Sequence, residues 1–403
     1  MLKVSGIPPN NLEGDKEKQG MSNGPAMAAR LVSEVLEPMR RDFVGKDEII
    51  DLLGISLIAG ENLFILGPPG TAKSALIHNL AARLEGKTFD YLLTRFTEPN
   101  ELFGPFDIRK LREGELITNT EGMLPEASLI FLDELLNANS AILNSLLVAL
   151  NERMFRRGKE TRPLEALLFV GASNHLPEDD ALKALFDRFL LRVHCGNVPG
   201  ERLPDVLEAG WRLAQTSPPR SNIRFEDLKQ IQPALLHVDL ASIRQPFAEL
   251  IQRIRHAGIP VSDRRAVKLQ RAIASSALLC GRTTARLSDL WVLRHIWDSQ
   301  EQQEVLGSLV SQVATKETPA PSDHHRSRSN EGPDPEALAR DLESLGVQLK
   351  SDSLPESERA YIGDRLGILE GRCQWVQDTA KREWLHQLIT ELRTRFKARG
   401  MAA

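Results

Sequence analysis

An apolar run that leads into a glycine-rich loop, ENLFILGPPGTAKS over residues 61–74, constrains the fold of this chain more than any other feature. The run has the composition of a buried strand, and the amphipathic segment 74–84, SALIHNLAARL, follows it. The loop nearly matches G-x-x-x-x-G-K-[ST], in which backbone N–H groups cradle phosphates, the lysine reaches the outer phosphates and the hydroxyl meets Mg²⁺. The sequence therefore predicts a nucleotide-binding loop between a strand and a helix, whose N-terminus adds a positive field.

One residue of the loop departs from the pattern, because Ala72 stands where the pattern has glycine before Lys73. If the loop requires a positive φ at this position, alanine costs roughly 1–2 kcal/mol. Contacts with phosphate and Mg²⁺ can outweigh that cost, so we expect the loop to bind nucleotide. The expected contacts are Gly67, Pro68, Pro69, Gly70, Thr71, Ala72, Lys73, Ser74 and Ala75.

Four further apolar runs alternate with helical or loop segments downstream of the loop. They are TFDYLLTRF at 88–96, SLIFLDE at 128–134, ALLFVGASN at 166–174 and FLLRVHC at 189–195. Alternation of this kind predicts an α/β fold with a parallel sheet covered by helices on both faces.

Two acids end the run 128–134, and in a parallel α/β sheet the ligand site lies at the carboxyl ends of the strands. We therefore expect Asp133 and Glu134 to point toward the phosphate loop. Asp133 would hold Mg²⁺ together with Ser74. Glu134 would polarise the attacking water, which Asp133 cannot do while it is occupied by the metal.

Three other positions carry weaker signals for the same chemistry. Asn174 ends the run 166–174 and can orient a phosphate or the water, although asparagine also closes strands as a turn residue. Arg188, in LFDRF, stands at a predicted helix end and can supply positive charge to a transferred phosphoryl group, and such an arginine can come from a neighbouring subunit. In SDRR, either Arg264 or Arg265 could touch the phosphates.

Composition limits the class of protein and its partners. The 403 residues carry a formal charge of −4, which argues against a nucleic-acid backbone as the main partner. No segment approaches about 18 uninterrupted apolar residues, and the N-terminus lacks a secretory signal pattern. We predict a cytoplasmic protein without membrane insertion.

The periodicity of the chain predicts five parts. These are a flexible tail at 1–27, an α/β nucleotide-binding core at 28–200, an all-helical domain at 201–315, a linker at 316–335 and a helical arm at 336–403, expected to be a helical hairpin or coiled-coil-like. His324 and His325 fall in the linker, where we expect solvated side chains rather than metal ligands.

The motifs together resemble one family. The order FVGKDEII, GPPGTAKS, LIFLDE, GASN, LFDRF, SDRR is similar to that of AAA+ ATPases of the MoxR group, and 172–193 resembles the regulatory-ATPase-variant (RavA) branch. The resemblance implies ATP and Mg²⁺ as cofactors and a helical AAA+ lid after the core. It also implies roles for Lys73, Ser74, Asp133, Glu134, Asn174, Arg188 and Arg264 as phosphate, magnesium, catalytic, sensor and finger residues.

The same resemblance assigns residues 98–128 to a β-hairpin inserted into a helix, the mark of the helix-2-insert clade. In a ring this hairpin could face the pore and grip a client through Phe106, Ile108 and Leu116, or it could pack on its own subunit. Arg109, Lys110 and Arg112 would give it a positive face. ALNERMF, with Asn151, Glu152 and Arg153, is similar to the family's motif at the subunit boundary.

The expected function is therefore that of an ATP-hydrolysing motor that remodels or matures a protein client. The resemblance implies that the motor is a homo-oligomer, a hexameric ring. MoxR proteins typically work with a partner that contains a von Willebrand factor A domain. One alternative is a nucleic-acid motor, which an aromatic content of 5% does not favour. The other is a nucleotide-gated scaffold without hydrolysis, which would be expected to lack Glu134 or Arg188.

Overall fold

A computed structural model describes residues 24–157, 160–216, 218–328, 335–349, 356–374, 376 and 379–400. Most of the expected tail lies outside these residues. Residues 24–27 differ from the expectation, because they begin a helical segment that runs to residue 42. This segment buries Ala28 and Leu31 in the main core, which gives its first turn a reason to be ordered.

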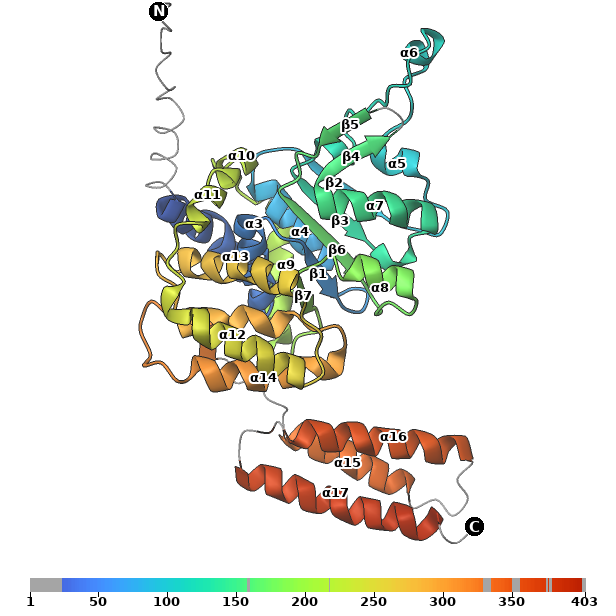
Figure 1. The fold of residues 1–403 in the computed structure, drawn as a ribbon, viewed down its shortest axis with the longest axis vertical. Helices are drawn as coiled ribbons and strands as arrows, with labels where there is room; N and C mark the ends of the chain where they lie inside the picture. Colours follow the sequence, from blue (N-terminus) through green and yellow to red (C-terminus); the bar gives the residue numbers. More distant parts are fainter. Residues whose placement is uncertain are drawn as a thin grey trace, which may run out of the picture.

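The centre of the fold is a five-stranded parallel sheet, as the apolar runs predicted (Figure 1). Its strands are β1 (Leu63–Leu66), β2 (Thr88–Leu92), β3 (Leu129–Asp133), β6 (Leu168–Ser173) and β7 (Leu191–His194). Their order across the sheet is β2-β3-β6-β1-β7. The strand that leads into the phosphate loop therefore lies between β6 and β7.

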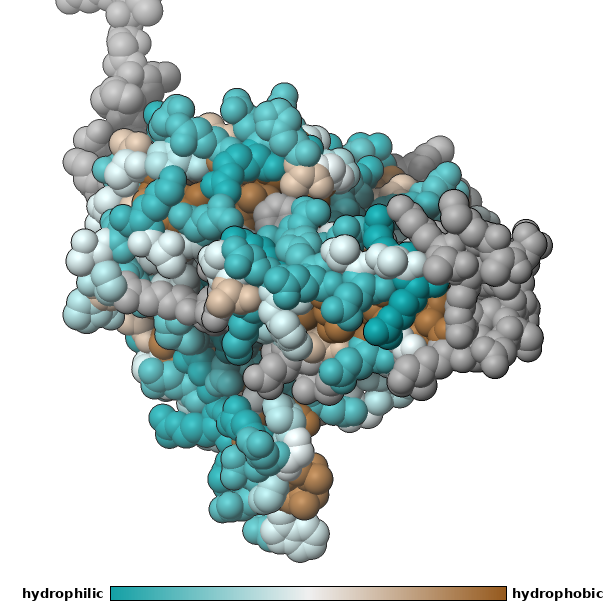
Figure 2. Space-filling model, turned by 90° about the horizontal axis from the view of Figure 1, so that it is seen from below, coloured by the Kyte–Doolittle hydropathy of each residue, from teal (hydrophilic) through white to brown (hydrophobic). Residues whose placement is uncertain are grey.

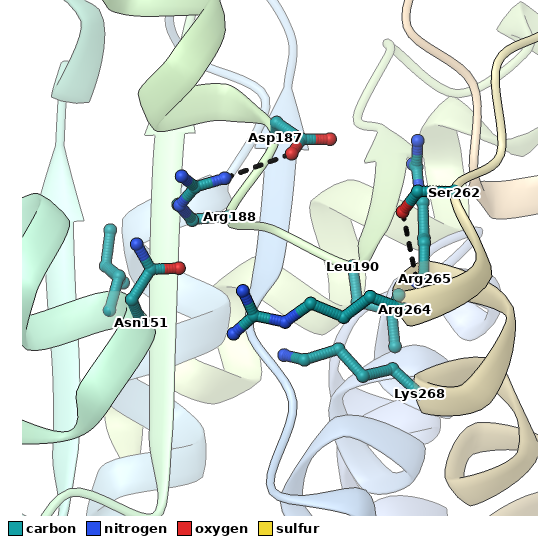
Figure 3. A pocket seen from close by; sticks show the side chains of 9 residues that line it. Asn151, Asp187, Arg188, Leu190, Ser262, Arg264, Arg265 and Lys268 are labelled. Carbon is teal, nitrogen blue, oxygen red and sulfur yellow. Dashed lines mark hydrogen bonds and ion pairs between the residues drawn. The ribbon is translucent and has the colours of Figure 1, made fainter.

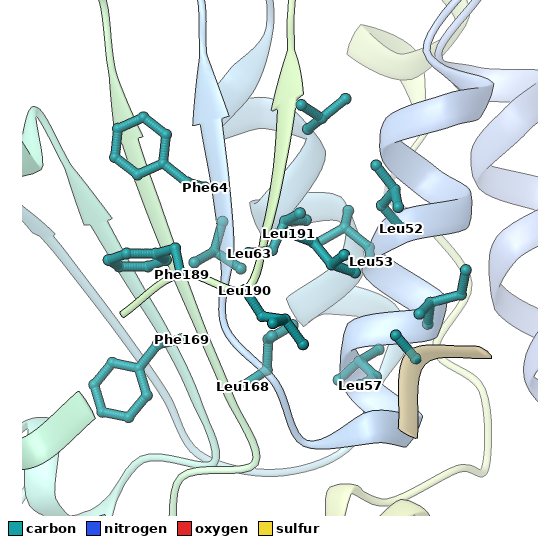
Figure 4. Close-up of a cluster of buried hydrophobic side chains, with 14 of the residues drawn as sticks. Leu52, Leu53, Leu57, Leu63, Phe64, Leu168, Phe169, Phe189, Leu190 and Leu191 are labelled. Carbon is teal, nitrogen blue, oxygen red and sulfur yellow. The ribbon is translucent and has the colours of Figure 1, made fainter. Parts of the chain in front are cut away.

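Helix α3 (Asp47–Ala59) packs against the sheet and is buried along nearly its whole length. Figure 4 shows Leu52, Leu53 and Leu57 of this helix beside Leu63 of β1 and Leu191 of β7. All four residues of β1 and all six of β6 are buried, as expected for parallel strands covered on both faces. Helix α3 ends at Gly60, whose φ of 66° is the left-handed conformation that glycine adopts without strain.

The remaining helices surround the sheet and form the lid (Figure 1). Around the core and its approaches lie η1 (Val32–Leu36), α2 (Glu37–Asp42), α4 (Lys73–Arg83), η2 (Leu124–Glu126), η3 (Leu135–Asn137), α7 (Ser140–Glu152), α8 (Asp180–Phe186), η4 (Gly200–Arg202), α9 (Leu203–Gln215), α10 (Phe225–Lys229) and α11 (Gln232–Leu235). The lid is built from α12 (Ala241–His256), α13 (Asp263–Leu279), η5 (Leu287–His295) and α14 (Gln300–Ala314).

The predicted insert hairpin has little β-structure. Between α5 (Pro99–Phe103) and residue 118 the chain turns back through a short helix, α6 (Ile108–Arg112), which projects from the body of the molecule in Figure 1. A single antiparallel bridge, Phe106 to Thr118, joins the two legs. A second antiparallel pair, β4 (Met154–Arg157) with β5 (Glu160–Pro163), was not predicted and supports the insert, because Glu160 accepts from the Thr118 N–H at 2.9 Å.

The predicted linker is docked at its end, where His324 and Ser327 are buried, so the expectation of a solvated side chain is wrong for His324, whereas His325 is exposed as expected. His324 is 5% exposed and stacks on Trp291 of η5 with 4.5 Å between ring centroids. Asp51 of α3 accepts from Arg326 Nε at 2.9 Å and pairs with His325 at 3.0 Å. A buried carboxylate with cationic and aromatic neighbours outweighs the loop-like composition on which the expectation rested.

The arm is a three-helix bundle rather than a hairpin, formed by α15 (Pro335–Gln348), α16 (Glu356–Cys373) and α17 (Thr379–Gly400). Its separate core contains the positions whose spacing predicted it, such as Ile362, Leu369 and Leu385. Arg372 of α16 donates at 2.7 Å to Glu304 of α14 and attaches the bundle to the lid. Seen from below, the coloured surface is mostly hydrophilic, with hydrophobic residues in small separate patches (Figure 2).

Candidate active site

The phosphate loop leaves the carboxyl end of β1 and places Lys73 at the first position of α4. Ala72 has φ 70° and ψ 23°, so the loop does require the left-handed conformation at this position. No side chain fits at Gly67, since a Cβ at this position would lie 2.1 Å from the carbonyl oxygen of Cys195. The loop therefore has its shape before any ligand is considered.

Lys73 is buried and turned over the loop. Its Nζ donates to the carbonyl oxygens of Gly67 at 2.6 Å and Pro68 at 3.0 Å. These acceptors hold the ammonium group at the centre of the loop, where phosphate oxygens would replace them as partners.

Ser74 and Asp133 meet across the edge of the sheet. Ser74 Oγ donates to Asp133 Oδ2 at 2.9 Å, and Asp133 Oδ1 accepts from the Glu134 N–H at 3.0 Å. A serine hydroxyl and a carboxylate are oxygen ligands of the kind Mg²⁺ prefers. The residues present thus fit a magnesium ion carried by a nucleotide, with Ser74 and Asp133 as its protein ligands.

Glu134 sits in the left-handed region, with φ 49° and ψ 42°, directly after β3. Its Oε2 is buried and has no hydrogen-bond partner among the described residues. An unpartnered buried carboxylate oxygen costs free energy, and strained backbone conformations gather at functional sites. Both observations fit a side chain held ready to accept a proton from a water molecule.

Asn174 follows β6 at the same edge of the sheet and is exposed. The register of the sheet pairs Leu66 with Ser173, so the residues that follow β1 and β6 leave side by side. The fold brings together Lys73, Ser74, Asp133, Glu134 and Asn174 at the carboxyl edge, as the sequence predicted.

Arg188 lies at the opposite edge of the sheet. It precedes β7, and its carbonyl oxygen accepts from Asn62 Nδ2 at 2.8 Å, immediately before β1 begins. From Asn62 to Gly67 the chain covers about 16 Å of extended strand at the usual rise per residue. Arg188 and the phosphate loop of one chain therefore belong to two different surfaces.

Arg188 lines a cavity with Asn151 of α7 and with Arg264 and Lys268 of α13 (Figure 3). The side chains of Arg264 and Lys268 extend from α13 toward Asn151, and Arg188 approaches from the loop after α8. Arg188 pairs with Asp187 at 3.1 Å and Lys268 with Glu61 at 2.9 Å. Lys268 carried no signal in the sequence, because its four-residue spacing from Arg264 reads as an ordinary helix face.

Arg264 and Arg265 point to different surroundings. Arg265 is 7% exposed, donates to the carbonyl oxygen of Ile296 at 2.8 Å and lies 3.6 Å from Asp298. Arg264 is exposed and lines the cavity. We expected either Arg264 or Arg265 to touch the phosphates. Arg265 does not fit this expectation, because its side chain is bound to Ile296 and Asp298 inside the lid.

The residues of the motif at 149–155 also lie in different environments. Arg153, with φ 53°, donates to Asn62 Oδ1 at 2.7 Å and lies over the Phe169 ring, 4.7 Å from its centroid. Burial, the main cause, lowers the pKa of Arg153 to about 10. Arg153 is thus a packing residue of its own subunit, whereas Glu152 pairs with Arg156 at 2.6 Å on the surface.

The insert exposes apolar side chains at its tip. Ile108 is 68% exposed and Leu116 40%, but Phe106 is covered by the Arg157 guanidinium at 4.3 Å from the ring centroid. Leu111 and Ile117 are exposed as well and were not singled out from the sequence. Leu111 lies between Lys110 and Arg112 in the sequence, and Ile117 directly follows Leu116.

A five-stranded parallel sheet with a phosphate loop after β1, two acids at the carboxyl end of β3 and a helical lid after the sheet defines an AAA+ ATPase. Residues 238–310 match the profile of an AAA lid domain. Residues 29–233 match that of the "MoxR domain in the MoxR-vWA-beta-propeller ternary systems", and the chain belongs to the MoxR family.

Similarity to known proteins supports the same family. Two uncharacterized proteins of Methanocaldococcus jannaschii are 34% and 35% identical, over 70% and 71% of this chain and 82% and 75% of their own lengths. The chaperone MoxR1 of Mycobacterium tuberculosis is 24% identical over 51% of this chain and 54% of its own. A crystal structure of an ATPase candidate from Cytophaga hutchinsonii has the same fold, with a TM-score of 0.61 and 19% identity, over 74% of this chain and 98% of that one.

None of the helices among the described residues has both the length and the apolar composition needed to cross a bilayer.

Proposed function

We propose that this chain binds ATP with Mg²⁺ and hydrolyses it at sites shared between neighbouring subunits of a ring, expected to be hexameric. The observation that carries the proposal is the separation of the two groups of residues. Lys73, Ser74, Asp133 and Glu134 lie at one edge of the sheet, and Arg188 lies at the other with Arg264. A complete site then needs two copies of the chain.

Within such a site each group of this chain has a defined task. Lys73 and the loop N–H groups bind the phosphates, and Ser74 and Asp133 hold the metal ion, whose charge helps to neutralise the phosphates. Glu134 orients the water and accepts its proton, with Asn174 beside it. Arg188, and Arg264 near it, stabilise the negative charge of the transferred group from the second subunit.

We further propose that hydrolysis drives the remodelling of a protein client together with a von Willebrand factor A domain partner. The support is the family, described as part of MoxR-vWA-beta-propeller systems, and the exposed apolar tip of the insert at Ile108 and Leu116. Assignment to the RavA branch rests on residues 172–193 alone and stays a prediction.

A subunit-mixing experiment tests the shared site. Arg188→Ala and Glu134→Gln subunits should each be nearly inactive, and mixing them should restore part of the ATPase activity, because some interfaces regain both wild-type groups. Subunit exchange is verified by mass photometry of differently tagged chains. No recovery at any ratio in exchanging assemblies would contradict the shared site.

A further inference from the structure

Lys268 lies on α13 one helical turn after Arg264 and has no task in the shared site proposed above. The two residues are four positions apart, so they share one face of the helix. Both line the cavity beside Arg188, and Figure 3 shows both side chains extending from α13 toward Asn151. Lys268 therefore occupies the same surroundings as the two arginines that we assign to the transferred phosphoryl group.

The cavity carries an excess of positive charge. Four of the described residues that line it are cationic, and one, Asp187, is acidic. Two of the cations have carboxylate partners, since Asp187 lies 3.1 Å from Arg188 and Asp298 lies 3.6 Å from Arg265. Among the described residues, the Arg264 guanidinium has no such partner. An excess of positive charge in a cavity favours an anionic ligand.

Glu61 holds the Lys268 ammonium in the single chain. Lys268 Nζ lies 2.9 Å from Glu61 Oε2, and the lysine side chain is 39% exposed while that of the glutamate is 7% exposed. The carboxylate is thus buried, whereas the ammonium remains accessible. An anion in the cavity can therefore reach Lys268 without any rearrangement of Glu61.

Glu61 keeps a cationic neighbour if Lys268 turns toward a ligand. Arg153 donates to the residues on either side of Glu61, to the carbonyl oxygen of Gly60 at 3.2 Å and to Asn62 Oδ1 at 2.7 Å. Burial lowers the pKa of Arg153, and the negative charge of Glu61 opposes this shift. A buried carboxylate that retains one cation loses less on giving up another.

The same segment places Lys268 close to Arg188. Asn62 follows Glu61 in the chain and donates to the carbonyl oxygen of Arg188 at 2.8 Å. The partner of the Lys268 ammonium and the anchor of the Arg188 backbone are therefore consecutive residues. One ligand can then meet both cations.

We propose that Lys268 is a third cation of the shared site, and that it leaves Glu61 to bind the outer phosphates of the ATP held by a neighbouring subunit. The inference rests on the shared site proposed above. Arg188 and Arg264 present planar forks of donors, whereas lysine is a compact charge on a flexible stem. Lys268 can therefore follow a phosphate oxygen that the two arginines leave uncovered.

Two variants break the Lys268–Glu61 pair from opposite sides and should behave differently. Lys268→Ala should lower the ATPase kcat/KM of the assembled protein by about ten- to a hundredfold, since it removes a charged hydrogen bond to the transferred group. Glu61→Gln removes the charge that competes for Lys268, so it should bind a slowly hydrolysed ATP analogue at least as tightly as the wild type. Equal defects in the two variants would make the pair purely structural and overturn the proposal.

The outer phosphate provides a second readout. Lys268→Ala should weaken binding of the ATP analogue to the assembled protein by at least about fivefold and leave ADP affinity within about twofold, because ADP lacks the phosphate that Lys268 contacts. Lys87→Ala is the matched control, since it also breaks a lysine–glutamate pair, at 2.8 Å from Glu126, and it should change neither affinity. Lys268→Gln repeats the test should Lys268→Ala lose the thermal midpoint of the wild type. Equal losses for the ATP analogue and ADP would contradict the contact.

Subunit mixing separates this inference from the shared site. Lys268→Ala subunits mixed with Glu134→Gln subunits should recover activity, as the mixture with Arg188→Ala does. Recovery with Arg188→Ala together with a normal kcat/KM in Lys268→Ala overturns the role of Lys268 and leaves the shared site intact, whereas no recovery with Arg188→Ala overturns both. Weaker assembly of Lys268→Ala in sedimentation velocity, with a normal kcat/KM once assembled, would pair Lys268 with an acidic side chain of the neighbour and also overturn the proposal.

Discussion

The Ser74 hydroxyl donates a 2.9 Å hydrogen bond to Asp133, which joins the first turn of α4 to the last residue of β3 across 59 positions of the chain. The pair fixes where a nucleotide-borne Mg²⁺ ion would sit, between the phosphate loop and the acids. Glu134, the next residue, is thereby left with its carboxylate free for a different task.

Replacement of Glu134 by Gln should separate catalysis from binding. The amide keeps the size of the side chain but cannot accept the proton of the water, and such a loss is typically 10²–10⁴-fold. We expect kcat to fall at least about a hundredfold with nucleotide affinity within threefold, measured by phosphate release and fluorescent-nucleotide titration. Glu249→Gln, on an exposed face of α12, is the control. Near-normal turnover in Glu134→Gln would place the base elsewhere.

Lys73→Ala should abolish nucleotide binding, because its buried ammonium supplies the cation at the centre of the loop. Lys87→Ala is the control, since this exposed lysine precedes β2 and pairs with Glu126 at 2.8 Å, away from the phosphate loop. The control should bind a fluorescent nucleotide with wild-type affinity. Undiminished affinity in Lys73→Ala would refute the assignment of the loop.

The left-handed backbone at Ala72 predicts opposite outcomes for two substitutions. Ala72→Gly should fold at least as well as the wild type and keep its nucleotide affinity, because glycine adopts φ 70° freely. Ala72→Val should lower both the thermal midpoint and the affinity, since a β-branched residue is strongly disfavoured there. Calorimetry and nucleotide titration compare the two; equal behaviour would show that the loop tolerates another conformation.

The neighbouring arginines of α13 should give different defects. Arg264→Ala should reduce the ATPase rate of the assembled protein with little effect on its thermal midpoint. Arg265→Ala should lower the free energy of unfolding by about 1–3 kcal/mol, because it removes the 2.8 Å hydrogen bond to the buried carbonyl oxygen of Ile296 and leaves that oxygen only the longer one from Arg192, at 3.3 Å. Denaturant titration measures the free energy of unfolding, and kinetics of the assembled protein measure the ATPase rate. A stability defect in Arg264→Ala and a rate defect in Arg265→Ala would exchange the roles of the two residues.

Acidification should loosen the docked segment at His324. Burial, more than the cationic neighbours, lowers the pKa of His324 to about 3. An unfolded chain takes up this proton near the ordinary value of about 6.5, so stability should fall as the pH drops below that value. His324→Phe keeps a ring on Trp291 without the titration. The difference in thermal midpoint between pH 7.5 and 5 should therefore be smaller in His324→Phe than in the wild type, and an equal difference would contradict this.

The local sequence determined the strands and the chemistry at their ends. Short apolar runs that alternate with helical segments are typical of parallel strands covered on both faces, and such a sheet brings every carboxyl end to one edge. Asp133, Glu134 and Asn174 were therefore predictable neighbours of Lys73. The loop pattern raised a positive φ at Ala72 only as a condition, and the structure shows it, at 70°.

Tertiary structure decided what depends on contacts between distant segments. The choice between Arg264 and Arg265 follows from the lid, which buries one guanidinium beside Ile296 and leaves its neighbour exposed. The sequence predicts a solvated His324, because its neighbours in the fold, Trp291 and Asp51, are 33 and 273 positions away in the chain. The separation of Arg188 from the phosphate loop is likewise set by the side of the sheet on which its segment enters. Local periodicity reports how a segment folds, whereas these outcomes depend on which distant surface covers it.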